Sequence, residues 1–422
     1  MATNGGLNII TDGIIFYYDT SNSKSYKGEP TTNYIYHQNP RIDPSYTSYV
    51  WTTSGTWQTK HPNAIRVYNN NGSEITGYVN GGVSDPNNAY HAVWVYDDIL
   101  KRPVVEMKDF DGSWKAKYID TGMNAWSTYG YTVGTQYTVS WLQWTSNITR
   151  GANVGLYTRN SGNSWNFWDG LITGTNTKIN TWERVYVTFT VSSSWDQTLP
   201  GNTIYMYGQG SPVATIRIAD VQLEIKGHPT SFNNSLIRSN SQGLLPLTTK
   251  TSLDLSNVSF NSNGEMIFDG TNDYFDINQN FGTLSQYTIE YVAYSNSGAR
   301  MPISSRTTTN FYKYGDNSWY YTHGGVGGEF YHSASPTLSG YIHYVITYDG
   351  SNVKVWRNNN YAGTQASTGT ADFSDGFKIG WWSYGSSFAW NGKIPIIKIY
   401  NKALTTDEVS KNYNAIKTRF NI

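Results

Sequence analysis

The densest apolar pattern in the chain lies near its C-terminal end, in the segment Ile394–Tyr400. Four isoleucines and a tyrosine occupy seven positions there, so the segment is too apolar for a strand with one face in water. We expect it to be a strand inside a sheet, with a second layer packed on top. Pro395 has no amide proton to give to a ladder, so the strand should begin after it or bulge there.

A helix is predicted directly after this strand. Thr405 and Glu408 have the spacing of a capping box, and Asp407 stands near the helix N-terminus, where negative charge is favourable. Val409, Tyr413 and Ile416 recur at helical spacing, which predicts one buried face. A buried strand followed by a capped helix describes the fold and says nothing of catalysis.

Most other apolar runs are short and bounded by Gly, Asn, Asp or Ser, which is typical of strands. The run in residues 13–19 has no local hairpin partner, so it must pair with a distant segment. A hairpin is expected around Asp349–Asn352, and a bulge at Ala219-Asp220. Strands are predicted in residues 137–144, 152–157, 184–190, 203–207, 214–225, 253–260, 266–277, 287–294, 341–348, 353–356 and 377–382.

A similar four-residue pattern occurs twice, about two hundred residues apart. Gly28-Glu-Pro-Thr31 and Gly227-His-Pro-Thr230 both read Gly-x-Pro-Thr. Glycine permits a sharp turn, and proline biases the residue before it to an extended conformation. Two such hinges would flank an inserted domain, although a chance match in a glycine-rich chain is the alternative.

Composition supports this all-β picture. The 422 residues include 40 Gly, 35 Tyr and 16 Trp, while only 14% are charged, a balance that favours β-sandwiches joined by polar turns. The formal net charge is zero, so no global field attracts nucleic acid. The absence of cysteine excludes disulfides, thiolate metal sites and cysteine nucleophiles.

Targeting signals are also absent from the sequence. The N-terminus lacks the basic and apolar regions of a secretory signal, and no segment reaches the roughly 20 apolar residues of a membrane span. We therefore expect synthesis in a cytoplasm, no signal peptide and no membrane insertion. The abundance of Asn, Ser, Gly and Tyr is nevertheless typical of an exposed surface protein, and release by cell lysis would reconcile the two expectations.

Three stretches resemble a known family. The segments 268–276, 344–356 and 391–409 look like a concanavalin A-like lectin/glucanase domain of the laminin-G type, and residues 11–26 look like its first strand. The ending Asn414–Ile422 is similar to endings of such domains in structural proteins of tailed bacteriophages. In that family the first and last strands are neighbours, which implies that residues 13–19 pair with residues 394–400.

The segments 181–190 and 218–224 resemble a galactose-binding-like jelly roll of the carbohydrate-binding-module kind. The expected fold class is therefore all-β: a concanavalin A-like β-sandwich with an inserted galactose-binding-like jelly-roll sandwich and a short C-terminal helix. The expected domains are residues 1–29 (first strand of the concanavalin A-like sandwich), 30–232 (inserted jelly roll) and 233–422 (remainder of the first sandwich). Residues 35–130 match no pattern.

Catalytic chemistry finds little support in the sequence. A retaining glycosidase needs two carboxylates about 5 Å apart, but Glu290 stands alone on its strand, and Asp273 and Asp276 lie in a turn-rich segment. No histidine pair has zinc spacing, and Asp97, Asp98, Asp109 and Asp111 lack a calcium-loop register. No cofactor is expected, except that the jelly-roll resemblance implies a structural calcium ligand at Asp220.

Aromatic side chains beside Asn, Asp and Gly are the remaining signal, because sugars stack their apolar C–H faces on aromatic rings. The alternatives are that these rings fill sandwich cores, as we expect for Trp141, or serve protein contacts. Trp165 and Trp168 lie in a loop-like stretch and are expected to be exposed. The candidate carbohydrate-binding residues are Trp165, Trp168, Trp319, Tyr320, Trp381, Trp382 and Tyr384.

Together these patterns and resemblances predict a non-enzymatic bacteriophage virion protein, a fibre, tail or head appendage that binds host-surface glycans. Its expected location is the virion surface, and its expected partners are other virion proteins, host polysaccharide and further copies of itself. Two alternatives remain: a capsid or tail decoration protein with a purely architectural role, and a polysaccharide depolymerase. The latter is disfavoured by the missing carboxylate pair.

Overall fold

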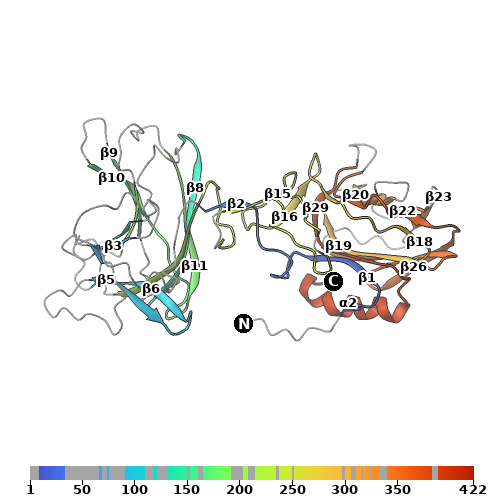
Figure 1. Ribbon diagram of the computed structural model, residues 1–422, viewed down its shortest axis with the longest axis horizontal. Coiled ribbons are helices and arrows are strands. Elements are labelled where there is room, and N and C mark those ends of the chain that lie inside the picture. Colours follow the sequence, from blue (N-terminus) through green and yellow to red (C-terminus); the bar gives the residue numbers. More distant parts are fainter. Residues whose placement is uncertain are drawn as a thin grey trace. The chain divides into compact units, whose positions relative to one another are not determined.

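The computed structural model divides the chain into two compact units (Figure 1). Unit 1 contains Met1–Pro30 and Arg238–Ile422, and unit 2 contains Thr31–Ile237. The structure describes residues 9–33, 66–68, 74–75, 91–109, 118–120, 132–149, 153–159, 165–191, 203–207, 214–233, 237–249, 251–296, 300–305, 310–314, 318–323, 326–331, 340–382 and 388–422.

Unit 1 is built around two antiparallel sheets. In the eight-stranded sheet the order is β15(Ser259–Phe260), β16(Met266–Asp269), β29(Asn391–Tyr400), β19(Tyr287–Ser295), β24(Tyr341–Tyr348), β25(Asn352–Arg357) and β26(Asn360–Ala366), and β1(Ile14–Asp19) also pairs with β29. In the six-stranded sheet the order is β17(Phe275–Ile277), β28(Phe377–Ile379), β20(Arg300–Ser305), β21(Asn310–Tyr314), β22(Ser318–His323) and β23(Val326–Tyr331). A separate ladder joins β18(Thr283–Leu284) to β27(Ala371–Asp372).

Strand β29 ties the two ends of the chain together. Its C-terminal half pairs with β1, where Phe16 lies opposite Ile399, and its N-terminal half pairs with β16. The pairing predicted for residues 13–19 is therefore confirmed. The ladder between β19 and β29 shifts register across Ile394 and Pro395, so the expected bulge also occurs.

Both faces of β29 are covered, which explains its unbroken apolar pattern. Ile397 and Ile399 belong to the sandwich core together with Phe16 and Tyr18, while Ile396 packs against Ile416 and Phe420 of the helix α2(Thr406–Phe420). Thr405 caps this helix and forms the predicted capping box with Glu408. Figure 1 shows α2 beside β1, although they come from opposite ends of the sequence.

Unit 2 also contains two antiparallel sheets. The six-stranded order is β10(Trp165–Thr173), β9(Asn153–Arg159), β12(Thr203–Tyr207), β7(Tyr118–Asp120), β3(Arg66–Tyr68) and β4(Glu74–Ile75). The five-stranded order is β11(Glu183–Thr190), β8(Gln136–Thr145), β13(Ala214–Glu224), β6(Arg102–Asp109) and β5(His91–Asp97). Trp141 is fully buried, as expected, and β13 bulges between Ala219 and Gln222 with Asp220 at φ +51°.

The two Gly-x-Pro-Thr hinges meet at one buried carboxylate. The hydroxyls of Thr31 and Thr230 each donate to Glu224 Oε1 at 2.5 Å, and the amide of Thr230 donates to Oε2 at 3.0 Å. Thr31 belongs to the short strand β2(Thr31–Thr32), which pairs with β14(Ile237–Arg238). The two similar motifs, which are about two hundred residues apart in the sequence, thus both bind the side chain of Glu224.

The chain is nearly all-β, with a single α-helix among the described residues, and this fold class agrees with the prediction. The hairpin around Asp349–Asn352 is confirmed as β24 and β25, with Tyr348 opposite Val353. In the part of the chain that the structure describes, no helix is long and apolar enough to cross a membrane.

Candidate functional site

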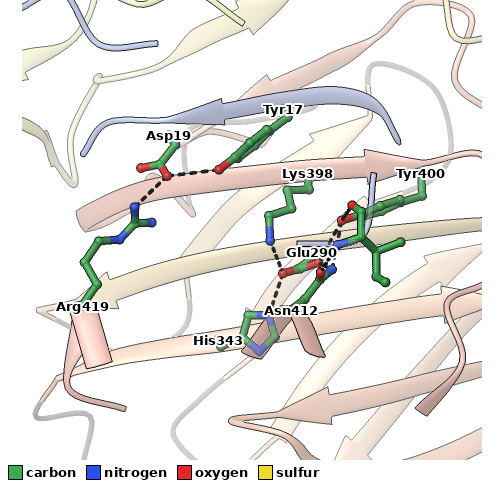
Figure 2. Close-up of polar contacts among 9 residues, drawn as sticks. Tyr17, Asp19, Glu290, His343, Lys398, Tyr400, Asn412 and Arg419 are labelled. Atoms are coloured by element: carbon green, nitrogen blue, oxygen red, sulfur yellow. Dashed lines mark hydrogen bonds and ion pairs between the residues drawn. The ribbon is translucent and has the colours of Figure 1, made fainter. Parts of the chain in front are cut away.

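The most elaborate polar cluster of unit 1 surrounds Glu290, on the face of the eight-stranded sheet that α2 covers (Figure 2). Lys398 Nζ lies 2.7 Å from Glu290 Oε1, and His343 Nε2 lies 2.9 Å from the same oxygen. Asn412, from α2, donates to Glu290 Oε2 at 2.6 Å. Three neighbouring strands and the helix therefore converge on one carboxylate.

The cluster also holds the N-terminal segment. The amide of Ile10 donates to Asn412 Oδ1 at 2.7 Å, and the Tyr400 hydroxyl lies 3.2 Å from the carbonyl oxygen of Ile10. A second contact joins the chain ends nearby, where Arg419 Nη1 lies 2.8 Å from Asp19 Oδ2 (Figure 2). Both sets of contacts fix α2 and the N-terminal strand to the sheet.

Burial makes this cluster structural. The side chains of Glu290, His343 and Lys398 are all 0% exposed, so no ligand reaches them. Burial alone would raise the pKa of Glu290, but Lys398 and His343 outweigh it and lower that pKa to about 2. A carboxylate that stays ionised in a closed site cannot serve as a general acid.

The lowered pKa makes the stability of unit 1 depend on pH. The pKa of Glu290 is about 2 in the folded protein against 4.5 for the free side chain, so the stabilisation is complete above pH 4.5 and is lost as the pH falls toward 2. We expect the denaturant midpoint of unit 1 to fall across this window. The control is a Glu290→Gln/Lys398→Met variant, whose midpoint should depend less on pH; equal dependence would contradict the assignment.

An accessible group of side chains lies instead on the six-stranded sheet, on the face opposite the core. Phe275, Ile277, Phe377 and Ile379 point into the core, so Asp276 and Lys378, which alternate with them, point outward. Asp276 and Lys378 are directly paired across β17 and β28, and Lys378 Nζ lies 2.8 Å from Asp276 Oδ1.

Two aromatic rings complete this group, which we call the outer patch: Tyr274, Asp276, Lys378 and Trp381. Lys378 Nζ lies 3.7 Å from the centroid of the Tyr274 ring, and the rings of Tyr274 and Trp381 are 5.8 Å apart. Ser304 Oγ donates to the carbonyl oxygen of Trp381 at 3.0 Å, which fixes the backbone there. All four side chains are partly exposed, so the outer patch offers aromatic surface beside polar groups.

The predicted aromatic residues are distributed over several places. Trp381 lies in the outer patch, whereas the ring of the adjacent Trp382 packs edge-on against Phe388. Tyr384 lies outside the described residues. For Trp165, Trp168, Trp319 and Tyr320 the structure describes strand positions but not side chains, so their role stays a prediction. The loop expected at Trp165 and Trp168 is wrong, because these residues pair with β9 in β10.

Asp220 forms an ion pair in unit 2. Its two carboxylate oxygens each lie 2.6 Å from a guanidinium nitrogen of Arg102, and its carbonyl oxygen accepts a hydrogen bond from Arg184. Among the described residues, no group of three His, Asp or Glu side chains is arranged to hold a metal ion. The calcium-ligand role of Asp220 stays a prediction.

Sequence reasoning missed Tyr274 and Lys378 and treated Asp276 as a turn carboxylate. The sequence did contain a usable signal. Apolar residues stand on both sides of Asp276 (Phe275 and Ile277) and of Lys378 (Phe377 and Ile379), and this alternation places Asp276 and Lys378 on the outer face of a strand. The pairing of β17 with β28, which joins segments a hundred residues apart, was not readable from local pattern.

Comparison with known proteins supports the architecture of unit 1. The family model described as "Concanavalin A-like lectin/glucanases superfamily" matches residues 269–410. This range covers β19, β24, β25, β29 and the strands of the six-stranded sheet together with Trp381. No curated protein matches the chain.

Several solved structures resemble part of the chain. A heptameric SAP-like pentraxin from Limulus polyphemus is 18% identical, with 34% of this chain and 78% of that chain covered and a TM-score of 0.30. Domain 4 of AbnA, an extracellular arabinanase from Geobacillus stearothermophilus, in complex with arabinotriose, is 13% identical (37% and 80% covered, TM-score 0.31). The receptor-binding domain of botulinum neurotoxin type G is 14% identical (41% and 48% covered, TM-score 0.33). Similarity this distant carries no functional inference.

Proposed function

We propose that this protein is a carbohydrate-binding protein whose lectin-like unit 1 binds glycans without cleaving them. The observation that carries the proposal is the match of residues 269–410 to the concanavalin A-like lectin/glucanase family. That range includes the six-stranded sheet that bears the outer patch, strand β29 and the first residues of α2.

The outer patch is the binding site that we propose within unit 1. Sugar rings present apolar C–H faces that pack on aromatic rings, and hydroxyls that need hydrogen-bond partners. Tyr274 and Trp381 supply the aromatic surface, while Asp276 and Lys378 supply an acceptor and a donor. The ion pair between Asp276 and Lys378 and the contact of Lys378 with the Tyr274 ring hold these groups in place before a ligand arrives.

Three carboxylates of unit 1 support the non-enzymatic part of the proposal. Glu290 is buried and paired with Lys398, and Asp276 forms an ion pair with Lys378. Asp273 is buried and accepts hydrogen bonds from Ser259 and from the amide of Asp269. Among these described side chains, no two carboxylates form the open pair that a retaining glycosidase requires.

Trp381→Ala is expected to weaken glycan binding by about tenfold, because removing one stacking ring forfeits roughly 1.4 kcal/mol of contact. Affinity is measured on the full chain by a glycan array, followed by calorimetric titration of the best ligand. The matched control is Tyr361→Ala, an aromatic residue of unit 1 that is 54% exposed on β26 of the other sheet. Unchanged affinity in Trp381→Ala, or an equal loss in Tyr361→Ala, would reject the outer patch.

We further propose that the protein acts on the surface of a bacteriophage particle, as a fibre, tail or head appendage that attaches to host-surface glycans. Support comes from the C-terminal ending, Asn414–Ile422, which resembles endings of phage structural proteins. Locating the protein in a particle reconstruction tests this role. Absence of glycan binding by a protein found in particles would favour decoration, and new reducing ends released from host polysaccharide would favour a depolymerase.

A further inference from the structure

Unit 2 carries a second constellation of aromatic and charged side chains, on the face of its five-stranded sheet that points away from the core. Trp144 on β8, Arg217 on β13 and Glu106 on β6 lie directly opposite one another across three neighbouring strands. The guanidinium carbon of Arg217 lies 4.9 Å from the centroid of the Trp144 ring. Trp182 directly precedes β11, whose first residue, Glu183, pairs with Gln143 on β8, so Trp182 lies next to the end of this row.

Two buried carboxylates hold Arg217 in a fixed position. Its Nε donates to Glu106 Oε2 at 2.8 Å, and its Nη1 donates to Asp97 Oδ2 at 3.0 Å. The Trp182 indole nitrogen donates to Asp97 Oδ1 at 3.2 Å, so the same carboxylate also positions the second tryptophan. The side chains of Asp97 and Glu106 are 1% and 6% exposed, whereas that of Arg217 is 29% exposed. The network therefore presents a rigid cation at the surface.

This sheet face is closed at one end and open at the other. At the closed end, Gln222 donates to Thr230 and accepts from the amide of Asn233, while Glu224 binds Thr31 and Thr230. Thr31 and Thr230 are the last residues of the two hinges, and Asn233 follows the second hinge. At the open end, Trp144 and Trp182 remain partly exposed, and no hydrogen bond of Arg217 Nη2 is found among the described residues.

We propose that the open end, formed by Trp144, Trp182 and Arg217, is a second carbohydrate-binding site, specific for neutral hexopyranoses. The tryptophans provide surface for the apolar face of a sugar ring, and Arg217 Nη2 provides a donor to a hydroxyl oxygen. Asp97 and Glu106 both form ion pairs with Arg217, so the positive charge of Arg217 is already neutralised before a ligand binds. A guanidinium group paired in this way offers no unpaired positive charge to an anionic sugar, which disfavours such ligands. The site is separate from the outer patch of unit 1.

The test uses full-length protein with ¹⁵N-labelled tryptophan, in which each indole N–H gives its own signal. Trp144→Ala and Trp182→Phe assign the two signals of interest. Methyl glycosides of glucose, galactose and mannose are the neutral probes, and glucuronic acid is the anionic probe. We expect saturable shifts of the Trp144 and Trp182 signals with at least one neutral glycoside, and none with glucuronic acid.

Three variants make the result specific. Trp144→Ala should abolish the shift of the Trp182 signal, and Arg217→Lys, which keeps the charge, should weaken binding at least fivefold. Tyr186→Ala removes an exposed ring on the same sheet face and should change nothing. A neutral-sugar response lost in Trp381→Ala would belong to unit 1, so the inference would fail while the proposed function stands. The inference is also overturned if neither the Trp144 nor the Trp182 signal shifts with any sugar, or if both shift with glucuronic acid alone.

Discussion

Glu290→Gln is expected to destabilise unit 1 by about 3–5 kcal/mol, because it leaves the ammonium group of Lys398 buried without a counter-charge. Lys398 is 0% exposed, and its Nζ lies 2.7 Å from the carboxylate that the substitution removes. The same change removes a negative charge from the acceptor of Asn412, which anchors α2. The loss of stability is measured by chemical denaturation, and in a separate experiment by hydrogen exchange of the β19 and β29 amides.

The matched control is Glu290→Gln combined with Lys398→Met. This pair removes both charges, and replacing a buried ion pair by uncharged side chains is often nearly neutral, so we expect most of the lost stability to return. A Glu290→Gln protein within 0.5 kcal/mol of the unsubstituted protein would show that the cluster is not closed. A double variant no more stable than the single variant would show that the charge on Lys398 is not the cause.

Phe16→Ala is expected to have a similarly large effect, about 3–5 kcal/mol, on unit 1 alone. Phe16 is 0% exposed and packs edge-on against Tyr18 and Phe281, at ring distances of 6.2 and 6.1 Å. Its strand, β1, completes the edge of β29 that β16 leaves unpaired. Removing the ring leaves a cavity in the core between the sheets.

Trp141→Ala in unit 2 serves as the comparison, because Trp141 is equally buried and belongs to β8. Hydrogen exchange should show lost protection in β19 and β29 for Phe16→Ala, and in β8 and β13 for Trp141→Ala. Lost protection of unit 2 in Phe16→Ala would mean that β1 stabilises unit 2 and not unit 1. The assignment of residues 1–30 to unit 1 would then fail.

Local pattern alone was enough for several elements. The β-branched run of β29 and the capping box of α2 were readable because strand burial and helix capping depend on residues within a few positions of one another. The bulge at Ala219-Asp220 was readable for the same reason, since it interrupts an alternation on one strand. The pairing of β1 with β29 needed the family resemblance, because nothing local links segments nearly four hundred residues apart.

The polar sites depended on tertiary structure. Glu290, His343, Lys398 and Asn412 come from three strands and a helix, and each is an ordinary polar residue in its own segment. They form a cluster only because burial excludes water, so that each side chain must find its hydrogen-bond or ion-pair partner among the others. The outer patch likewise requires β17 to meet β28, and the Trp144–Arg217 row requires three strands in register.

The sequence by itself therefore determined the all-β class, the capped C-terminal helix and the buried last strand, since period, capping and turn chemistry act over short distances. The family resemblance had already implied that this last strand pairs with the first strand of the chain. Only the tertiary structure decided that β29 is locked in place by an ion pair with no solvent access. It also decided which aromatic rings stand beside charged partners. Both depend on side chains brought together across the sheets, and no local pattern records that proximity.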